Sequence, residues 1–494
     1  MIRATTFAGK QVAVFGLGGS GIAAAHALVA GGADVVCWDD GEAGRQRAVS
    51  EGLATADLQQ MDWSQFSSLV LTPGVPLTHP EPHWTVHKAH QNGVEVIGDI
   101  EIFARQREAV CPNAPFIAIT GTNGKSTTTA LTAHLLHQLG FCVEMGGNIG
   151  RAMLTLDPPA PERIHVVEMS SYQIDLTPTL RPTVGVLLNI TPDHLDRHGT
   201  LAHYAEVKER LLRDANAAAV GLDDKLTRAA AERISDSHRL YAFTIGKGAG
   251  LIPRLYAIGP RLFVHETAGS YATSEEVANL AEIGSLRGQH NVQNALAALA
   301  TVKALQTVAD RGGASLTATQ NDRSLLWDVK RLAAGLASFP GLPHRMEEIG
   351  RAGRVLFIND SKATNADAAE KSLASFPGGI HWIAGGRAKE GGIGSLAAMF
   401  PRIEKAYLIG EAAEQFTATL APHVPCEQSA TLQQAVASAA ANAAASSAAE
   451  PVVLFSPACA SFDQYHNFEI RGDAFRDLAM ALQGISAVTA GADR

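Results

Sequence analysis

One stretch of the chain combines glycines, a lysine and hydroxyl side chains at the spacing of a phosphate-binding loop. It reads Ile119-Thr120-Gly121-Thr122-Asn123-Gly124-Lys125-Ser126-Thr127, with an apolar run before it and a helical stretch, Thr128–Leu139, after it. Glycines let backbone N–H groups turn toward a phosphate, and the helix N-terminus adds the positive end of its dipole. Lys125 can neutralise phosphate charge and Ser126 can bind Mg²⁺. A helix cap beside a chance lysine is the alternative, since Ile119 stands where the usual motif has its first glycine.

Polar residues follow two further apolar runs of the same region, Ile164–Val167 and Thr183–Leu188. Glu168 comes directly after the first run, and His194 lies in the polar segment after the second. In open parallel sheets, ligands bind where the strands end at their carboxyl edge, so we expect both side chains near the phosphate loop. Glu168 would offer Mg²⁺ the oxygen ligand that it prefers. The alternatives are a solvent-exposed charge for Glu168 and a helix-cap or core histidine for His194.

Lys208 interrupts an apolar stripe. The segment that follows Thr200 predicts a helix with that threonine as its cap. Positions 201, 204, 208, 211 and 215 share one face of this helix, and their residues are Leu, Tyr, Lys, Leu and Ala. Burial of an unpaired ammonium group is costly. We therefore expect Lys208 to be paired, deprotonated, chemically modified or extended to the surface along its aliphatic stem.

A second glycine-rich turn lies near the N-terminus. Gly16-Leu17-Gly18-Gly19-Ser20-Gly21 follows an apolar run, and Asp39 stands about 20 residues further on, as in the dinucleotide-binding fingerprint. Taken alone this motif suggests NAD, but other nucleotide diphosphates can use such a turn. Thr72-Pro73-Gly74 is another turn after an apolar run, for which a structural role and a ligand contact are both open.

The last third of the chain places lysines beside polar turns. The turns that follow its apolar runs are Asp360–Asn365, Gly385–Lys389 and Ser456–Gln464. Helix N-termini beside Lys362 and Lys389 would make two pockets for carboxylates. The alternative is helix capping alone, because Thr364–Asp367 and Ser461–Gln464 have the spacing of capping boxes.

Apolar runs and helical stretches alternate along the chain. Continuous apolar runs fit buried parallel strands, and their alternation with helices indicates an α/β fold. Clusters of proline and glycine at 111–115 and 339–343 predict domain boundaries. We expect three domains: 1–111 with a Rossmann-like parallel sheet, 112–338 with a P-loop ATPase-like α/β fold, and 339–494 with a second Rossmann-like α/β fold. The stretch 310–330 has weak periodicity and reads as an insertion.

Composition limits the class of protein. The chain has 494 residues, 46% of them hydrophobic and 18% charged, which is enough for large cores and unlike a disordered chain. Its net charge of −9 argues against a nucleic-acid or membrane-surface binder. We expect no transmembrane helix and no signal peptide. Five scattered cysteines predict neither disulfides nor a zinc site, which favours the cytoplasm. We expect a monomer.

Together and in this order, these motifs resemble the Mur ligase family over almost the whole chain. The parts shared by the family are the phosphate loop, Asn148, Glu168, His194, Lys208, His290–Asn294 and His344-Arg345. Asp360–Asn365 together with Ser456–Ser461 is similar to the branch of the family that adds D-glutamate. The resemblance implies amide-bond formation between UDP-N-acetylmuramoyl-L-alanine and D-glutamate through an acyl phosphate, in peptidoglycan precursor synthesis.

The resemblance also implies ligands and residue roles. The N-terminal domain would bind the UDP substrate, the central domain ATP, and the C-terminal domain D-glutamate while completing the ATP site. Two Mg²⁺ ions would be held, one by Ser126 and Glu168 and one by His194 and a carbamylated Lys208. The catalytic residues would be Lys125, Asn148, Glu168, His194 and Lys208. The ATP site would comprise Gly121, Thr122, Asn123, Gly124, Lys125, Ser126, Thr127, Asn294, Arg345 and Asp360. The UDP-substrate site would comprise Gly16, Leu17, Gly18, Gly19, Ser20, Gly21, Asp39, Asp40, Thr72, Pro73 and Gly74. The D-glutamate site would comprise Lys362, Thr364, Lys389, Ser461 and Phe468.

Three other functions stay open at this point. The first is that of another ligase of the superfamily, which adds a different amino acid or extends folate. The second is that of a nicotinamide-dependent oxidoreductase, which rests on the turn Gly16–Gly21. The third is that of a non-catalytic P-loop protein, which binds ATP without turning it over.

Overall fold

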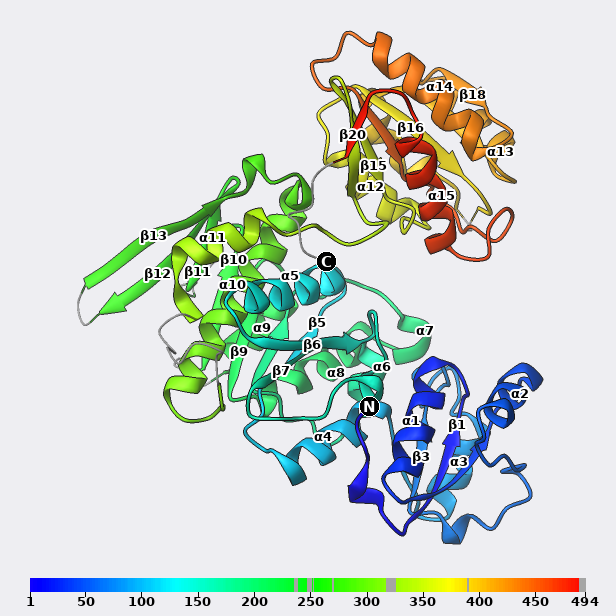
Figure 1. The fold of residues 1–494 in the computed structure, drawn as a ribbon, viewed down its shortest axis with the longest axis vertical. Coiled ribbons are helices and arrows are strands. Elements are labelled where there is room, and N and C mark those ends of the chain that lie inside the picture. Colours follow the sequence, from blue (N-terminus) through cyan, green and yellow to red (C-terminus); the bar gives the residue numbers. More distant parts are fainter. Residues whose placement is uncertain are drawn as a thin grey trace. The chain divides into compact units, whose positions relative to one another are not determined.

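The computed structural model describes residues 1–234, 239–246, 251, 253–268, 271–316, 326–388 and 391–487. The chain forms two compact units, one of Met1–Leu280 with His290–Leu336 and one of Ala281–Gln289 with Ala337–Arg494. Each unit contains α/β layers (Figure 1), so the predicted fold class is confirmed. Among the described residues, no helix is long and apolar enough to cross a membrane.

The first unit begins with a four-stranded parallel sheet in the order β2-β1-β3-β4. Its first strand carries an uninterrupted buried run, Val12–Phe15, which is typical of a strand covered on both faces. The carboxyl end of this strand leads directly into the turn at Gly16. The strands are β1 (Gln11–Phe15), β2 (Asp34–Trp38), β3 (Ser68–Leu71) and β4 (Glu95–Ile97), and the helices are α1 (Gly19–Ala30), α2 (Glu42–Ser50), α3 (Trp84–Gln91) and α4 (Asp99–Val110).

A nine-stranded sheet forms the rest of the first unit, in the order β13-β12-β11-β10-β9-β8-β5-β7-β6. Strands β5 to β11 are parallel, whereas β12 and β13 add antiparallel pairs at one edge. The strands are β5 (Phe116–Thr120), β6 (Cys142–Gly147), β7 (Arg163–Glu168), β8 (Val184–Leu187), β9 (Ala217–Gly221), β10 (Leu240–Thr244), β11 (Leu255–Ile258), β12 (Arg261–Ala268) and β13 (Tyr271–Asn279). The helices are α5 (Lys125–Gln138), α6 (Ser171–Asp175), α7 (Leu195–His198), α8 (Leu201–Arg213), α9 (Lys225–Glu232), α10 (Gln289–Asp310) and α11 (Val329–Ala337).

The stretch 310–330 joins α10 to α11, and its residues 317–325 lie outside the described part of the chain. Close packing of α8 on the sheet depends on a glycine. A Cβ atom added at Gly185 of β8 would overlap the backbone carbonyl of Leu211 in α8. This close approach holds the buried face of α8, which includes Lys208, against the strands.

The second unit contains a seven-stranded sheet in the order β18-β17-β16-β19-β15-β14-β20. Helices α12 and α13 contribute to the apolar core on one face, and α14 and α15 contribute to the core on the other (Figure 1). The alanine-rich α14 buries Ala435, Ala439 and Ala443, which recur every four residues. The strands are β14 (Glu347–Ala352), β15 (Val355–Asn359), β16 (Ile380–Gly385), β17 (Ile403–Ile409), β18 (Cys426–Gln428), β19 (Val452–Phe455) and β20 (Ile485–Ala487), and the helices are α12 (Ala366–Ala374), α13 (Ala413–Leu420), α14 (Leu432–Ala445) and α15 (Phe468–Met480).

Candidate functional site

The phosphate loop joins β5 to α5, and the helix begins at Lys125, three residues earlier than predicted. Gly124 caps this helix with a φ of 83°, a left-handed conformation that favours glycine. A Cβ atom at Gly124 would also collide with the side-chain oxygen of Asn294. The loop therefore lies directly against Asn294, so two parts of the predicted ATP site meet in one place.

Asn189 holds the loop in shape. Its carbonyl oxygen accepts a hydrogen bond of 2.9 Å from the backbone N–H of Thr122, and its side-chain oxygen accepts one of 2.9 Å from the N–H of Asn123. The Lys125 ammonium group donates to the carbonyl oxygens of Gly121 and Thr122, at 3.0 and 2.8 Å. The lysine thus lies over the loop that precedes it. Asn189 has no role in the expected site, although it follows a predicted strand.

The buried Glu168 and the exposed Asn148 form a pair that adjoins this loop. Glu168 ends β7 beside β5, and its Oε1 accepts a hydrogen bond of 2.9 Å from the Asn148 side chain. Its Oε2 is buried and has no hydrogen-bond donor among the described residues. A buried carboxylate oxygen without a partner is costly, and a divalent cation would satisfy it. The donor set therefore fits Mg²⁺.

Lys208 is buried, with 1% of its surface exposed. Its ammonium nitrogen donates to Thr120 Oγ1 at 3.2 Å and to the Gly121 carbonyl at 3.0 Å, and it lies 4.7 Å from the centre of the Tyr204 ring. Burial holds the pKa of Lys208 well below its usual range, and the nearby Lys125 charge lowers it further, against Asp193 and Glu168. The structure therefore excludes a side chain that extends to solvent.

His194 lies at the exposed start of α7 with a φ of 51°, as a helix-cap residue. Its Nε2 is 3.5 Å from Asp193, and its ring lies 5.1 Å from that of Tyr172. Sequence reasoning missed the buried His198 of the same helix, whose Nε2 lies 2.8 Å from Ser171 Oγ. Burial, assisted by nearby cations, lowers the pKa of His198 to about 4.

The glycine turn after β1 and the turn after β3 also meet. A Cβ atom at Gly16, whose φ is 90°, would strike the Thr72 side chain. Asp39 does not stand free to bind a ribose. Its carboxylate accepts hydrogen bonds from the backbone N–H groups of Leu17, at 2.6 Å, and Gly41, at 2.7 Å, and so holds the turn. The carboxylate of Asp40 lies 3.1 Å from His83 Nε2.

In the second unit, Asp360 follows β15 and is 4% exposed. It accepts hydrogen bonds from Ser372, from Ser456 Oγ at 2.9 Å and from the Met346 N–H at 3.2 Å. Burial raises the pKa of Asp360 to about 6, although these bonds and the Arg345 charge act in the opposite direction.

The predicted D-glutamate residues Lys362 and Phe468 lie together, with the ammonium nitrogen 5.1 Å from the ring centre. The capping-box interpretation of the hydroxyls was wrong. Asn365 caps α12, and Ser461–Gln464 forms a turn, while Asn467 caps α15. Neither Thr364 nor Ser461 therefore serves as a helix cap. Lys389 lies outside the described residues.

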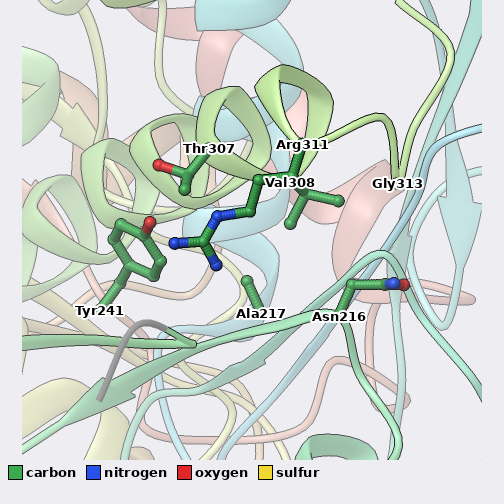
Figure 2. Close-up of a pocket in the computed structure, with 7 residues that line it drawn as sticks. All are labelled: Asn216, Ala217, Tyr241, Thr307, Val308, Arg311 and Gly313. Carbon is green, nitrogen blue, oxygen red and sulfur yellow. The ribbon is translucent and has the colours of Figure 1, made fainter. Parts of the chain in front are cut away.

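One pocket of about 220 Å³ lies elsewhere, at the amino ends of β9 and β10 (Figure 2). These strands are parallel to β5 through β8, so the pocket is at the sheet edge opposite the phosphate loop. Its lining residues are Asn216, Ala217, Tyr241, Thr307, Val308, Arg311 and Gly313. None of the predicted site residues is among them.

Comparison with known proteins gives two family matches. The Mur ligase middle domain matches residues 119–302, and the Mur ligase, glutamate ligase domain matches residues 344–459. The UDP-N-acetylmuramoylalanine--D-glutamate ligase of Mesorhizobium japonicum is 56% identical over 488 residues, which cover 99% of each chain. The ligase of the same name from Brucella abortus is 54% identical over 491 residues, covering 99% of this chain and 100% of that one.

Among solved structures, the UDP-N-acetylmuramate-alanine ligase MurC from Thermotoga maritima has a similar fold. It covers 96% of this chain and 99% of its own, with a TM-score of 0.54 and 17% sequence identity. This likeness concerns the fold alone, whereas the curated relatives match the chain closely in sequence from end to end.

Proposed function

The chain belongs to the Mur ligase family, and from this premise we propose that it joins D-glutamate to UDP-N-acetylmuramoyl-L-alanine with ATP as the energy source. The curated relatives cited above carry the name of this reaction. The observation that supports it most is that the phosphate loop, the Glu168–Asn148 pair and the buried Lys208 adjoin one another at one sheet edge. We also propose the division into domains 1–111, 112–338 and 339–494.

ATP provides the driving force, because a carboxylate does not acylate an amine unaided. A carboxylate oxygen of the UDP substrate attacks the γ-phosphorus, the bond from phosphorus to ADP breaks, and an acyl phosphate forms. The D-glutamate amine then attacks the acyl carbon, loses a proton and expels phosphate. Lys125 and the loop N–H groups would stabilise the charge on the phosphoryl group.

Ser126 and Glu168 would hold one Mg²⁺ ion, and His194 and Lys208 a second, and these ions would neutralise phosphate charge. Lys208 reaches this role as a carbamate. Burial lowers the pKa of Lys208 and so favours the uncharged amine. The amine nitrogen would add to the carbon of CO₂ and release one proton to solvent, which leaves an anionic carbamate. This modification would turn a costly buried cation into a metal ligand.

The remaining assignments follow the family resemblance. The ATP site would take Gly121, Thr122, Asn123, Gly124, Ser126, Thr127 and Asn294, with Arg345 and Asp360 from the second unit. The residues that bind the UDP substrate would be Gly16–Gly21, Asp39, Asp40 and Thr72–Gly74. The residues that bind D-glutamate would be Lys362, Thr364, Lys389, Ser461 and Phe468. The Asp39 carboxylate would act through the glycine turn, because its oxygens hold backbone N–H groups.

Phosphate release tests the proposal. The purified chain receives UDP-N-acetylmuramoyl-L-alanine and MgATP with either D-glutamate or L-glutamate. We expect D-glutamate to stimulate phosphate release and L-glutamate to leave it at background. Stimulation by a different amino acid would instead support another ligase of the superfamily.

Two further measurements distinguish this ligase from a simple ATP-binding protein and from an oxidoreductase. A Lys125→Ala variant should lose roughly 10²–10³-fold in turnover, the usual cost of removing one such charge-stabilising group. Unchanged turnover with weaker ATP binding would favour a simple ATP-binding protein. Binding of NADH in preference to UDP would favour an oxidoreductase.

A further inference from the structure

Arg197 connects two predicted sites whose motifs lie far apart in the sequence: the turn after β3 and the segment that carries His194. It lies in α7, three residues after His194, and its guanidinium group reaches the turn after β3. It donates to the carbonyl oxygens of Gly74 and Val75 at 3.0 Å each, and makes a longer contact of 3.5 Å with that of Pro73. One side chain thus contacts three consecutive carbonyl groups, and two of them, those of Pro73 and Gly74, belong to the turn that we propose for the UDP substrate.

A second contact holds the same helix against the same loop. Gly199, the residue after α7, has a φ of 73°, and a Cβ atom there would come within 2.7 Å of His79 Nε2. Residues 73–79 therefore lie against both Arg197 and Gly199. Two separate contacts, at Arg197 in α7 and at Gly199 after it, hold this segment, so Arg197 is not an isolated surface arginine.

The guanidinium group also contacts an aromatic ring that lies beside His194, the histidine to which we assign a metal-binding role. Arg197 lies 4.6 Å from the centre of the Tyr172 ring. Tyr172 stacks on His198 at 5.4 Å, with 12° between the ring planes, and lies 5.1 Å from the ring of His194. The face of the aromatic ring attracts the guanidinium charge. A movement of Arg197 would therefore disturb the surroundings of His194.

We propose that Arg197 is a positioning residue, which fixes the turn at 72–75 relative to the segment that carries His194. This inference rests on the proposed function, because the proposed function is what assigns the UDP substrate to this turn. The UDP end of the substrate would be bound on one side of this link and its reacting carboxylate on the other. Arginine suits the position because its planar fork has five donors, whereas lysine has a single ammonium group that cannot span three carbonyl groups.

The expected signature is a selective kinetic defect. Misplacement of a reacting group by about 1 Å can cost on the order of 10²-fold in rate. We expect Arg197→Lys to lower kcat/KM for UDP-N-acetylmuramoyl-L-alanine by about 10- to 100-fold. The KM for ATP should stay within about twofold of the wild-type value, because Arg197 makes no hydrogen bond to the phosphate loop in the described part of the chain.

The test compares Arg197→Lys and Arg197→Gln with Arg181→Gln. Arg181 is exposed and makes no ion pair with any described residue, so its replacement controls for loss of one positive charge. Steady-state kinetics for all three substrates is measured alongside thermal unfolding and calorimetric binding of UDP alone. Support requires a defect confined to the UDP substrate, larger for Gln than for Lys, with the unfolding temperature unchanged. Equal activity of all three variants, or a uniform loss that follows the folded fraction, would overturn the inference.

Failure of the inference is distinguishable from failure of the proposed function. If the wild-type chain shows no D-glutamate-dependent phosphate release, the proposed function fails. Calorimetry with UDP then still tests the role of Arg197. A lower affinity of its variants for UDP supports a role at this turn, and an unchanged affinity for UDP contradicts it. If the wild-type chain is active and the Arg197 variants match Arg181→Gln, only the inference fails.

Discussion

Lys208 occupies a position where a cation is costly. Its amine is buried against two oxygen acceptors and an aromatic ring, and no carboxylate of the described residues makes an ion pair with it. Helical periodicity in the sequence was enough to predict that Lys208 occupies a buried position. It could not choose between pairing, deprotonation and modification, because that choice depends on neighbours from β5 that are some 90 residues away.

We predict that Lys208→Ala abolishes ligation and that small added carboxylic acids restore part of it. A carboxylic acid in the vacated space would supply the anionic oxygens that the carbamate supplies in the wild-type chain. The measurement is D-glutamate-dependent phosphate release across a series of acids from formate to butyrate. A Lys208→Ala variant that is active without any added acid, and indifferent to CO₂, would remove the carbamate from the mechanism.

The buried carboxyl group of Asp360 should make the free energy of unfolding depend on pH. Burial raises the pKa of its carboxyl group to about 6, above the value of about 3.9 expected for the unfolded chain. Between these values the folded state binds a proton that the unfolded state lacks. The contribution to stability is therefore fully present below about pH 4 and is lost as the pH rises through about 6.

The comparison is between the wild-type chain and Asp360→Asn in urea unfolding at several pH values from 4 to 7. We expect the stability of the wild-type chain to rise relative to the variant on acidification, by at most about 3 kcal/mol. A difference that stays constant over this range would show that Asp360 is ionised in the folded protein at pH 5.

Residues missed by sequence reasoning share one property: their roles arise from contacts remote in the chain. Arg197 acts on residues more than 120 positions earlier, and Asn189 supports a loop more than 60 positions earlier. By contrast, the phosphate loop, Glu168 and Lys208 are marked locally, by glycine spacing, a strand end and an interrupted stripe. Local signals identify such residues, but they do not show which of them meet.

At the scale of the elements, apolar runs identified the buried parallel strands, including β1, β5, β7, β15 and β19. The sequence interpretation missed the half-exposed strands β11 to β13, and it also missed the buried parallel strands β9 and β10. Helix starts were also displaced. Thr364 and Asn365 are both good caps, and only the backbone path decides between them.

Gly124 provides a test at this scale, since it sets the direction in which α5 leaves the loop. Gly124→Ala must adopt a φ of 83°, which costs roughly 1–2 kcal/mol, and must also displace the Asn294 side chain. We expect affinity for a non-hydrolysable ATP analogue to fall at least about tenfold, or about 1.4 kcal/mol. Gly259→Ala is the matched control, because Gly259 has a φ of 59° and open space around it. Equal affinities in the two variants would contradict the role of Gly124.

At the scale of the molecule, the proposed ATP residues belong to both compact units. Gly124, Lys125 and Asn294 lie in the first unit, and Arg345 and Asp360 lie in the second. The proposed D-glutamate residues belong to the second unit alone. In the proposed mechanism the amine must reach an acyl phosphate formed at the phosphate loop, so we expect ligands to bring the second unit onto the first.

We therefore predict that ligands compact the chain in solution. Small-angle X-ray scattering should show a smaller radius of gyration with the UDP substrate and a non-hydrolysable ATP analogue than with neither. We expect Lys125→Ala, which removes a positive charge beside the phosphate loop, to shift this change to higher nucleotide concentration. Scattering curves that superimpose with and without both ligands would count against closure.

In the proposed mechanism, ATP activates the carboxylate of the UDP substrate by converting it to an acyl phosphate. Ligation with both oxygens of the L-alanine carboxylate labelled with ¹⁸O tests this step directly, with mass spectrometry of the released phosphate. The mechanism predicts one labelled oxygen in each phosphate and one retained in the new amide, because the attacking oxygen leaves with phosphorus. Unlabelled phosphate, formed together with the amide product, would contradict the mechanism.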